Sequence, residues 1–321
     1  MDPLDKVSQD SVFVVVPSYN HAPFVQRCLR SIIGQTHRPE KLLVIDDGSW
    51  DGSPAIIEKV LNDAPFATEL IARENRGLCA TLNQALDLSK GEFFAYLGSD
   101  DVWLPPFLKE QTNLLAKRPN AVLAFSHAYL VDENDSVFDS TAEWTDFADG
   151  DLRPLLLAGS VFSSPGVLYR RDALKRHRWN ETARLEDYEM YLKLSYDGEF
   201  ARNQKVLCAW RQHGENASGD LPLMVDEMVA AQNRILPAAE RDRYQSVLRF
   251  AAAENLVRHG FRYEAAKLFI ENLDGARSWS DVARTAARLT VPQTLFQWNR
   301  RRKRRAAESK YGTLDEVMKN G

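Results

Sequence analysis

The sequence has few cysteines, no long apolar run and no recognisable leader, and each absence removes a class of protein. The three cysteines, Cys28, Cys79 and Cys208, lie far apart and form no Cys-x-x-Cys pair, which argues against a zinc ribbon or a thioredoxin-like motif. Such a sparse, odd count fits a reducing compartment. No apolar stretch approaches the about 20 residues of a membrane-spanning helix. Residues 1–5 lack the basic and apolar regions of a signal peptide, so we expect a cytoplasmic protein.

The chain also lacks a large excess of charge of either sign. The formal net charge is −4, which points to no global attraction for nucleic acid, and we expect no specific nucleic-acid partner. With 321 residues, 44% hydrophobic and 27% charged, the chain can form one large domain and a smaller one. One unbroken basic block departs from this average: Arg300, Arg301, Arg302, Lys303, Arg304 and Arg305.

Short apolar runs alternate with helical patterns over the first two thirds of the chain. The predicted strands are residues 12–16, 42–45, 68–72, 93–97, 121–131, 167–169 and 205–210. Apolar residues at helical spacing predict helices over residues 24–33, 53–61, 78–88 and 186–194, and another that ends near residue 116. This alternation is typical of an α/β fold with a doubly wound, mostly parallel sheet flanked by helices.

Strand signals stop beyond about residue 220. Helical patterns cover residues 224–235, 240–259 and 263–273, so we predict an all-helical C-terminal region. We place the domain boundary near residue 217, which gives domains 1–217 and 218–321. Residues 132–153 are polar and irregular, and we interpret them as a flexible flap over a cleft.

Acidic pairs stand directly after two of the apolar runs. Asp46-Asp47 follows one predicted strand, and Asp100-Asp101 follows another. Open α/β sheets bind ligands at the carboxyl ends of parallel strands, and buried carboxylates there need a cation or hydrogen-bond donors. The simplest use of such groups is a divalent cation that carries a phosphorylated substrate.

The order and spacing of four motifs resemble a known family. Residues 14–20 (VVVPSYN), 44–49 (VIDDGS), 99–101 (SDD) and the pair Glu186-Asp187 look like a family 2 inverting glycosyltransferase of the GT-A fold, over roughly residues 11–217. The resemblance implies transfer of a sugar from a nucleotide-diphosphate donor, with a UDP-sugar preferred, to a hydroxyl of a glycan or lipid-linked acceptor. It also implies a setting in bacterial surface polysaccharide synthesis.

The resemblance assigns a donor site and a cation site. It implies Mn²⁺ or Mg²⁺ at the DxD-type element, with Asp100, Asp101 and His213 as ligands, and Arg211 with His213 near the diphosphate. Gly98 departs from the commoner Asp-x-Asp-Asp and removes one possible contact. An aspartate after the second strand contacts the nucleoside, and the choice between Asp46 and Asp47 stays open. The full nucleotide-binding set that we predict is Pro17, Ser18, Tyr19, Asn20, Asp46, Asp47, Asn75, Arg76, Gly77, Ser99 and Asp100.

The pair Glu186-Asp187 carries the predicted catalysis. Inversion at a sugar carbon needs one displacement, in which a base removes the proton of the acceptor hydroxyl while the diphosphate leaves. By resemblance, Asp187 is that base and Glu186 orients the acceptor or the loop. Structural explanations compete at each position: a helix N-cap for Asp100-Asp101, favourable charge at a helix N-terminus for Glu186-Asp187, and a structural histidine for His213.

The basic block suggests a surface for a partner. Leu295, Phe296 and Trp298 precede it, and aromatic residues beside arginines suit a helix that lies on anionic lipid at the inner face of the membrane. A solvated helix, or a tail that binds nucleic acid without specificity, explains the same residues. The oligomeric state is open, a homo-oligomer included.

Two other functions fit parts of the sequence. A sugar-phosphate nucleotidyltransferase uses a similar fold, but it favours a glycine-rich phosphate loop after the first strand, and residues 17–21 (PSYNH) contain no glycine. A non-enzymatic adaptor with a degenerate site would use the helical region and the basic tail to bind a membrane or a partner. Gly98 favours the adaptor hypothesis, whereas the retained Asp100, Asp101 and Asp187 argue against it.

Overall fold

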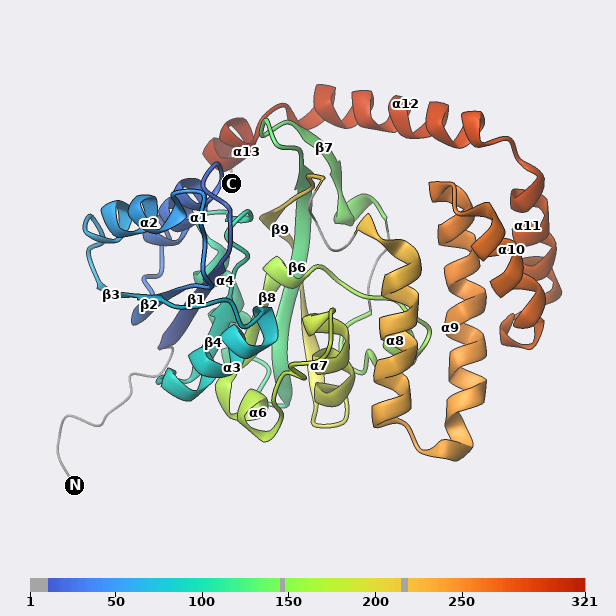
Figure 1. The fold of residues 1–321 in the computed structure, drawn as a ribbon, viewed down its shortest axis with the longest axis horizontal. Helices are drawn as coiled ribbons and strands as arrows, with labels where there is room; N and C mark the ends of the chain where they lie inside the picture. Colours follow the sequence, from blue (N-terminus) through green and yellow to red (C-terminus); the bar gives the residue numbers. More distant parts are fainter. Residues whose placement is uncertain (1–10, 145–147, 215–218, 321) are drawn as a thin grey trace.

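The computed structural model describes residues 11–144, 148–214 and 219–320. One mixed sheet forms its centre, with strand order β3-β2-β1-β4-β8-β6-β9-β5, and β7 pairs with β6 beside this path (Figure 1). The strands are β1 (Val12–Ser18), β2 (Lys41–Asp46), β3 (Ala67–Ala72), β4 (Phe93–Tyr96), β5 (Val102–Trp103), β6 (Ala121–Val131), β7 (Val137–Ser140), β8 (Val167–Arg170) and β9 (Glu199–Arg211).

Parallel pairing is confined to two parts of the sheet. The strands β3, β2, β1 and β4 are parallel neighbours, and β6 is parallel to β9. The other pairs, β4 with β8, β6 with β8, β6 with β7 and β5 with β9, are antiparallel. The expected α/β sheet is therefore present, and its second half is mixed rather than parallel because β8 runs against both of its neighbours.

Helices cover both faces of the sheet, and more helices follow it. They are α1 (Val25–Ile33), α2 (Ser53–Leu61), α3 (Leu78–Leu88), α4 (Phe107–Ala116), α5 (Arg153–Leu157), α6 (Arg171–Arg176), α7 (Glu186–Leu194), α8 (Leu221–Ile235), α9 (Ala238–His259), α10 (Arg262–Glu271), α11 (Trp279–Thr290), α12 (Gln293–Tyr311) and α13 (Leu314–Asn320). None of the helices in the described ranges is both long enough and apolar enough to span a membrane.

Alternate residues of the central strands pack into separate cores. In β1, Val14 and Val16 face a core that includes Leu29 of α1, whereas Val15 faces a core that includes Leu82 of α3. Because both faces are covered, neither can be polar, and this explains the uninterrupted apolar runs of the parallel strands.

The C-terminal region returns to the sheet. In Figure 1, α12 passes above the sheet from α11 toward α13, near the N-terminal helices. Leu314 and Val317 of α13 are buried in a small core with Val102, Val131 and Ala209 of the sheet. The predicted domain boundary near residue 217 lies outside the described residues, since 215–218 are not described, and the division into two domains stays a prediction.

The segment that we expected to be an irregular flap is partly ordered. It contains β7 and a 3₁₀ turn (Thr141–Glu143) and ends at the first residue of α5, while residues 145–147 lie outside the described residues. A backbone hydrogen bond ties β7 to the C-terminal segment: the N–H of Val137 donates to the Gly312 carbonyl at 3.0 Å. This pairing partner lies too far along the chain for local sequence patterns to indicate it.

Candidate active site at the carboxyl ends of the parallel strands

The first two parallel strands end at the same edge of the sheet. Pro17 and Ser18 close β1 and pair with Ile45 and Asp46 at the end of β2. The N–H of Asp47 then donates to the Ser18 carbonyl at 2.8 Å. The register therefore places the first two predicted nucleotide-binding segments side by side, at the edge where open α/β sheets bind ligands.

Asp46 and Asp47 hold the loops of this edge in place. Both oxygens of Asp46 accept from Ser49, one from its N–H at 2.9 Å and one from its hydroxyl at 2.7 Å. Asp47 accepts from the N–H groups of Arg76 and Gly77 at 2.9 and 2.7 Å, and it pairs with Arg73 at 2.5 Å. Both carboxylates are buried, so their internal contacts explain how buried charge is tolerated there.

The loop after β1 is tied to the loop after β2. Asn20 has a left-handed backbone (φ 52°), its N–H donates to the Ser49 hydroxyl, and its side-chain oxygen accepts from the Trp50 N–H. Asparagine tolerates this conformation better than most residues. Tyr19 stands 46% exposed beside it, free to contact a ligand. The buried Ser18 hydroxyl has no hydrogen-bond partner in the described part of the chain.

The third predicted nucleotide segment lies on the surface. Asn75 and Arg76 are exposed, and Gly77 adopts a positive φ of 87° immediately before α3. The contacts of Asp47 with two N–H groups of this loop fix its backbone, whereas the Arg76 side chain points to no partner that the structure records. The loop therefore reaches the same edge through its backbone.

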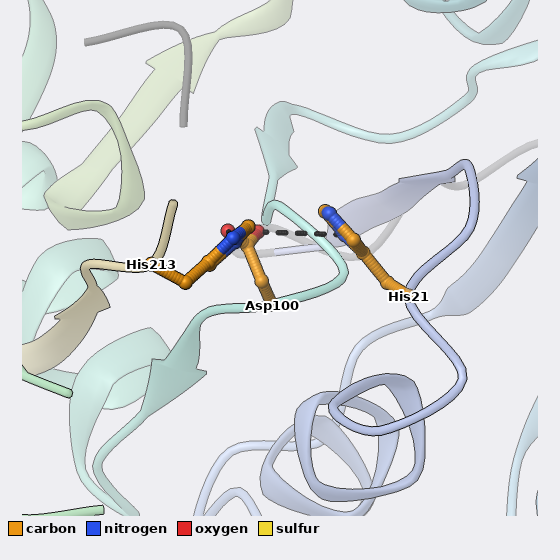
Figure 2. Close-up of side chains that lie close together, drawn as sticks. All are labelled: His21, Asp100 and His213. Carbon is orange, nitrogen blue, oxygen red and sulfur yellow. Dashed lines mark hydrogen bonds and ion pairs between the residues drawn. The ribbon is translucent and has the colours of Figure 1, made fainter. Parts of the chain in front are cut away.

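Three side chains from distant parts of the chain meet beyond this edge (Figure 2). One donor atom from each of His21, Asp100 and His213 lies within 4.8 Å of the others, and this is the one such group of metal-binding residue types in the described ranges. His213 Nε2 lies 3.1 Å from Asp100 Oδ2, and His21 Nδ1 lies 3.8 Å from Asp100 Oδ1. Imidazole nitrogen and carboxylate oxygen are common ligand atoms for divalent cations, so these three residues suit a metal ion.

Asp100 is charged at neutral pH in this setting. Burial raises the pKa of its carboxyl, but the hydrogen bond with His213 and the nearby His21 outweigh burial and lower that pKa below its ordinary value. Ser99 supports the cluster, because its hydroxyl lies 2.8 Å from His21 Nδ1. His21 was not among the residues that the sequence singled out, although its place directly after the PSYN motif was a usable signal.

Asp101 has different surroundings from Asp100. It is buried, and its Oδ1 accepts from the backbone N–H of Arg211 at 2.8 Å. Burial and the neighbouring Asp100 raise the pKa of Asp101 well above its ordinary value. The geometry favours Asp100 over Asp101 as the carboxylate of a cation site, and the metal role of Asp101 stays a prediction that this placement does not support.

Gly98 is explained by the crowding of these two carboxylates. A Cβ atom at Gly98 would lie 2.8 Å from Asp100 Oδ1 and 3.1 Å from Asp101 Oδ2. Those distances are shorter than normal contacts, so a larger residue would displace both side chains. The glycine is therefore compatible with the present position of Asp100 and is no sign of a decayed site.

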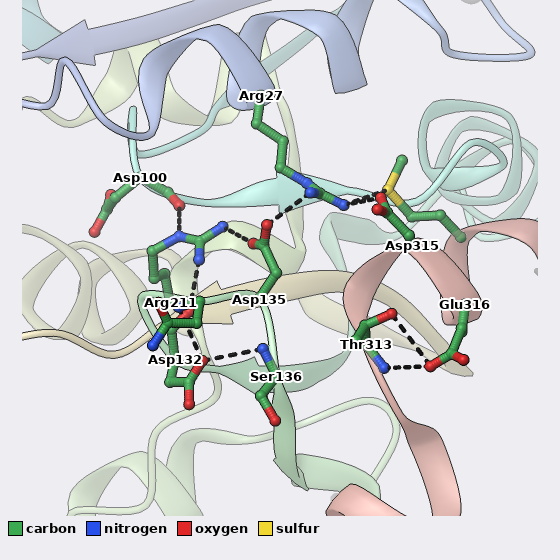
Figure 3. A network of polar contacts seen from close by, with 11 residues as sticks. Arg27, Asp100, Asp132, Asp135, Ser136, Arg211, Thr313, Asp315 and Glu316 are labelled. Carbon is green, nitrogen blue, oxygen red and sulfur yellow. Dashed lines mark hydrogen bonds and ion pairs between the residues drawn. The ribbon is translucent and has the colours of Figure 1, made fainter.

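Arg211 is the centre of a buried polar network (Figure 3). Its guanidinium donates to the Asp100 carbonyl at 2.9 Å, to the Asp132 carbonyl at 2.6 Å and to the Asp135 carboxylate at 2.6 Å. It also lies 4.9 Å above the ring of Phe24. These contacts fit a residue that positions the loop carrying Asp100, and they leave the predicted contact between Arg211 and a diphosphate without support.

The pair Glu186-Asp187, which the sequence predicts to be catalytic, lies at the start of α7 and contacts the end of β4. The hydroxyl of Tyr96, at the end of β4, donates to Glu186 at 3.2 Å. Burial first, and the charge of Glu186 second, raise the pKa of Asp187 to about 8. Glu186 also helps to raise the pKa of Asp101, so the two acidic groups share one electrostatic environment. A carboxyl with a pKa near 8 is a stronger base than an ordinary aspartate.

Several known proteins are similar to this chain in sequence. The chain is 27% identical over 215 residues to an uncharacterized glycosyltransferase of Nostoc sp., which covers 64% of this chain and 66% of that protein. It is 25% identical over 208 residues to a chondroitin synthase of Pasteurella multocida, which covers 64% of this chain and 21% of that protein. The chain thus spans less than two thirds of these curated relatives.

Solved structures share the fold. The crystal structure of S. aureus TarS 1–349 in complex with UDP-GlcNAc has a TM-score of 0.62 at 17% identity, over 94% of this chain and 91% of that chain. The mannosyltransferase PcManGT from Pyrobaculum calidifontis, in complex with GDP-Man and Mn²⁺, has a TM-score of 0.58 at 20% identity, over 93% of this chain and 86% of that chain.

A protein-family model matches the part of the chain that forms the strands and loops of this edge. The model of glycosyl transferase family 2 matches residues 13–178, just over half of the chain. That range contains β2, β4 and all of β1 except Val12, together with His21 and Asp100. The chain belongs to glycosyl transferase family 2.

Proposed function

We propose that this protein is a metal-dependent inverting glycosyltransferase. It moves a sugar from a nucleotide-diphosphate donor, with a UDP-sugar preferred, to a hydroxyl of a glycan or lipid-linked acceptor. Membership of the family supports the reaction class. The TarS complex with UDP-GlcNAc supports a uridine donor, and the Pasteurella chondroitin synthase supports a polysaccharide product in a bacterial setting.

The donor would lie along the edge formed by β1, β2 and β4. Tyr19 and the 75–77 loop flank the nucleoside, while Asp46 and Asp47 keep the loops around it in place. His21, Asp100 and His213 would hold Mn²⁺ or Mg²⁺ beside the diphosphate. A divalent cation bound there would neutralise the negative charge that develops on the leaving diphosphate.

Asp187 would act as the base. The single observation that carries the proposal is the place of Asp187 at the start of α7, next to Glu186, which Tyr96 at the end of β4 contacts. Burial and Glu186 also raise its pKa to about 8. At that pKa its carboxylate accepts the proton of an acceptor hydroxyl more readily than an ordinary aspartate does. Glu186, held by the Tyr96 hydroxyl, would orient the acceptor. Attack then comes from the face opposite the diphosphate, which inverts the anomeric carbon.

The direct test is hydrolysis and transfer from a panel of UDP-sugars with Mn²⁺, comparing the wild type with Asp187→Asn. We expect the wild type to release UDP and the variant to bind the same donor while turnover falls by at least about 100-fold. Unchanged turnover in the variant would remove Asp187 as the base. Release of pyrophosphate from UTP and a sugar phosphate would instead favour a nucleotidyltransferase, and failure to bind any nucleotide would favour an adaptor.

The place of action that we propose is the inner face of a cell membrane. Leu295 and Trp298 of α12 are 54% and 60% exposed, and Arg302 lies over the Trp298 ring. The basic block follows on the same helix, and none of the residues of that helix is buried in the described structure. Exposed aromatic residues beside basic ones suit the interface of an anionic bilayer, where a lipid-linked acceptor would be presented.

A further inference from the structure

The spacing of the His21–Asp100–His213 cluster suits one small cation. Bonds from imidazole nitrogen or carboxylate oxygen to such an ion are about 2.0–2.2 Å, so donors on one ion lie roughly 3–4.3 Å apart. The distances from Asp100 oxygens to His213 Nε2 and His21 Nδ1 are 3.1 and 3.8 Å. Both distances, which run to different oxygens of the same carboxylate, fall in that range, and all three donor atoms lie within 4.8 Å of one another.

Neighbouring groups contact both rings. His21 Nδ1 lies 2.8 Å from the Ser99 hydroxyl, a contact that a bound cation would replace, and the His213 ring stacks on Phe24 with centroids 5.3 Å apart. The side chains of His21, Asp100 and His213 are 23%, 12% and 8% exposed. Three protein donors would fill only part of the coordination sphere of a divalent cation, which leaves positions for diphosphate oxygens and water.

The cluster lacks a second carboxylate. Gly98 contributes no side chain, and a Cβ there would press on Asp100 and Asp101. Asp101 lies outside the group of three, and its Oδ1 accepts from the Arg211 N–H. The donor set is therefore two imidazole nitrogens and one carboxylate, in place of the all-oxygen set that Mg²⁺ prefers.

We infer that His21 is a protein ligand of the cation, and that this nitrogen-rich site selects Mn²⁺ or a similar first-row transition ion over Mg²⁺. The inference rests on the proposed function for the role of the cation. Imidazole suits transition ions, whereas Mg²⁺ takes oxygen ligands and retains several waters. In this chain, His21 provides the third donor that Gly98 does not.

Mn²⁺ binding to the full-length protein tests the inference without measuring turnover. The free-ion signal in electron paramagnetic resonance gives the affinity, with and without UDP, and Mg²⁺ competition gives the selectivity. We expect His21→Ala to weaken Mn²⁺ binding by at least about tenfold. His21→Asp should reduce the preference for Mn²⁺ over Mg²⁺ by a similar factor, because it replaces nitrogen with oxygen. His259→Ala, at the exposed end of α9, is the matched control.

Pulsed resonance of bound Mn²⁺ counts the coordinated nitrogens. We expect couplings to two imidazoles in the wild type and His259→Ala, and to one in His21→Ala. One imidazole in the wild type, unchanged couplings in His21→Ala, or equal affinity for Mg²⁺ and Mn²⁺ would overturn the inference. A protein that binds Mn²⁺ through two imidazoles but transfers no sugar would contradict the proposed function alone.

Discussion

At the scale of single residues, neighbouring carboxylates in this site differ by their surroundings. Asp100 is held charged by two histidines, whereas Asp101 accepts a backbone N–H and has a raised pKa. Asp187 has its pKa raised to about 8 by burial and by Glu186. The roles of these acids follow from local burial and partners, because the residue type is the same in each case.

The raised pKa of Asp187 predicts a pH dependence. Below about pH 8 the base is protonated, so kcat/KM of the free enzyme should fall about tenfold per pH unit on the acid side. A raised carboxyl pKa also means that stability is lost as pH rises toward 8, since the unfolded aspartate ionises first. Asp187→Asn should therefore raise Tm more at pH 8 than at pH 5. A pH-rate profile with its acid limb below pH 5, or an equal Tm difference at both pH values, would contradict this assignment.

Asp47 predicts a stability effect. It is buried, pairs with the half-buried Arg73 and accepts two N–H groups of the 75–77 loop. Asp47→Asn leaves Arg73 without its charge partner and should lower the free energy of unfolding by about 3 kcal/mol. Urea denaturation measures the change, and Glu74→Gln on the exposed surface of the same loop is the control. Full stability of Asp47→Asn with weakened nucleotide binding would assign Asp47 to the ligand instead.

At the scale of elements, the short helix α13 is connected through polar contacts to the loop that carries Asp100. Arg27 of α1 contacts both Asp315 of α13 and Asp135, and Asp135 in turn pairs with Arg211 (Figure 3). Arg211 then donates to the Asp100 carbonyl. A chain of contacts thus connects the C-terminal segment to the backbone of a proposed cation ligand.

Leu314 should contribute most of the energy of this docking. It is fully buried beside Val102 and Val131, whereas Asp315 is 70% exposed in its side chain. Leu314→Ala should lower the free energy of unfolding by about 3 kcal/mol, and Asp315→Asn by less than about 1 kcal/mol. Leu295→Ala on the exposed part of α12 serves as the matched control. Comparable losses for Leu314→Ala and Leu295→Ala in urea denaturation would show that α13 is not docked in solution.

At the scale of the whole molecule, the basic block lies together on one helix, α12. Arg304 is engaged with Asp132 and Glu308, while Arg300, Arg301 and Arg305 are exposed on α12. The block therefore forms a local positive surface on a chain whose formal net charge is −4. Attraction to an anionic bilayer through such a surface does not require the protein to be basic as a whole.

Replacement of Arg300, Arg301 and Arg305 by Gln tests this surface. Each basic residue near an anionic bilayer contributes about 1 kcal/mol, so the triple variant should bind vesicles with anionic lipid roughly 100-fold more weakly. Co-sedimentation with phosphatidylglycerol-containing vesicles measures it, with phosphatidylcholine vesicles as reference. A matched variant, with Lys59, Lys90 and Lys109 replaced by Gln on the sheet domain, removes the same charge. Equal losses in the two variants, or binding that is insensitive to salt, would rule out the proposed surface.

The sequence by itself determined the elements that depend on local patterns. The bounds of α2, α3 and α7 agree with the apolar spacing, and the acidic pairs stand at the carboxyl ends of β2 and β4 as expected. Alternating strands and helices were enough to indicate the α/β class, because apolar runs and helical periodicity are properties of neighbouring residues.

Only the tertiary structure decided which side chains meet. Asp100 rather than Asp101 faces His213, His21 joins them from another loop, and Arg211 is buried in a network with Asp135. The direction of a side chain after a strand depends on the turn, and contacts between distant segments depend on how the sheet and α13 pack. Neither quantity is encoded in local spacing, so the sequence indicated candidate residues and the fold decided which of them lie together.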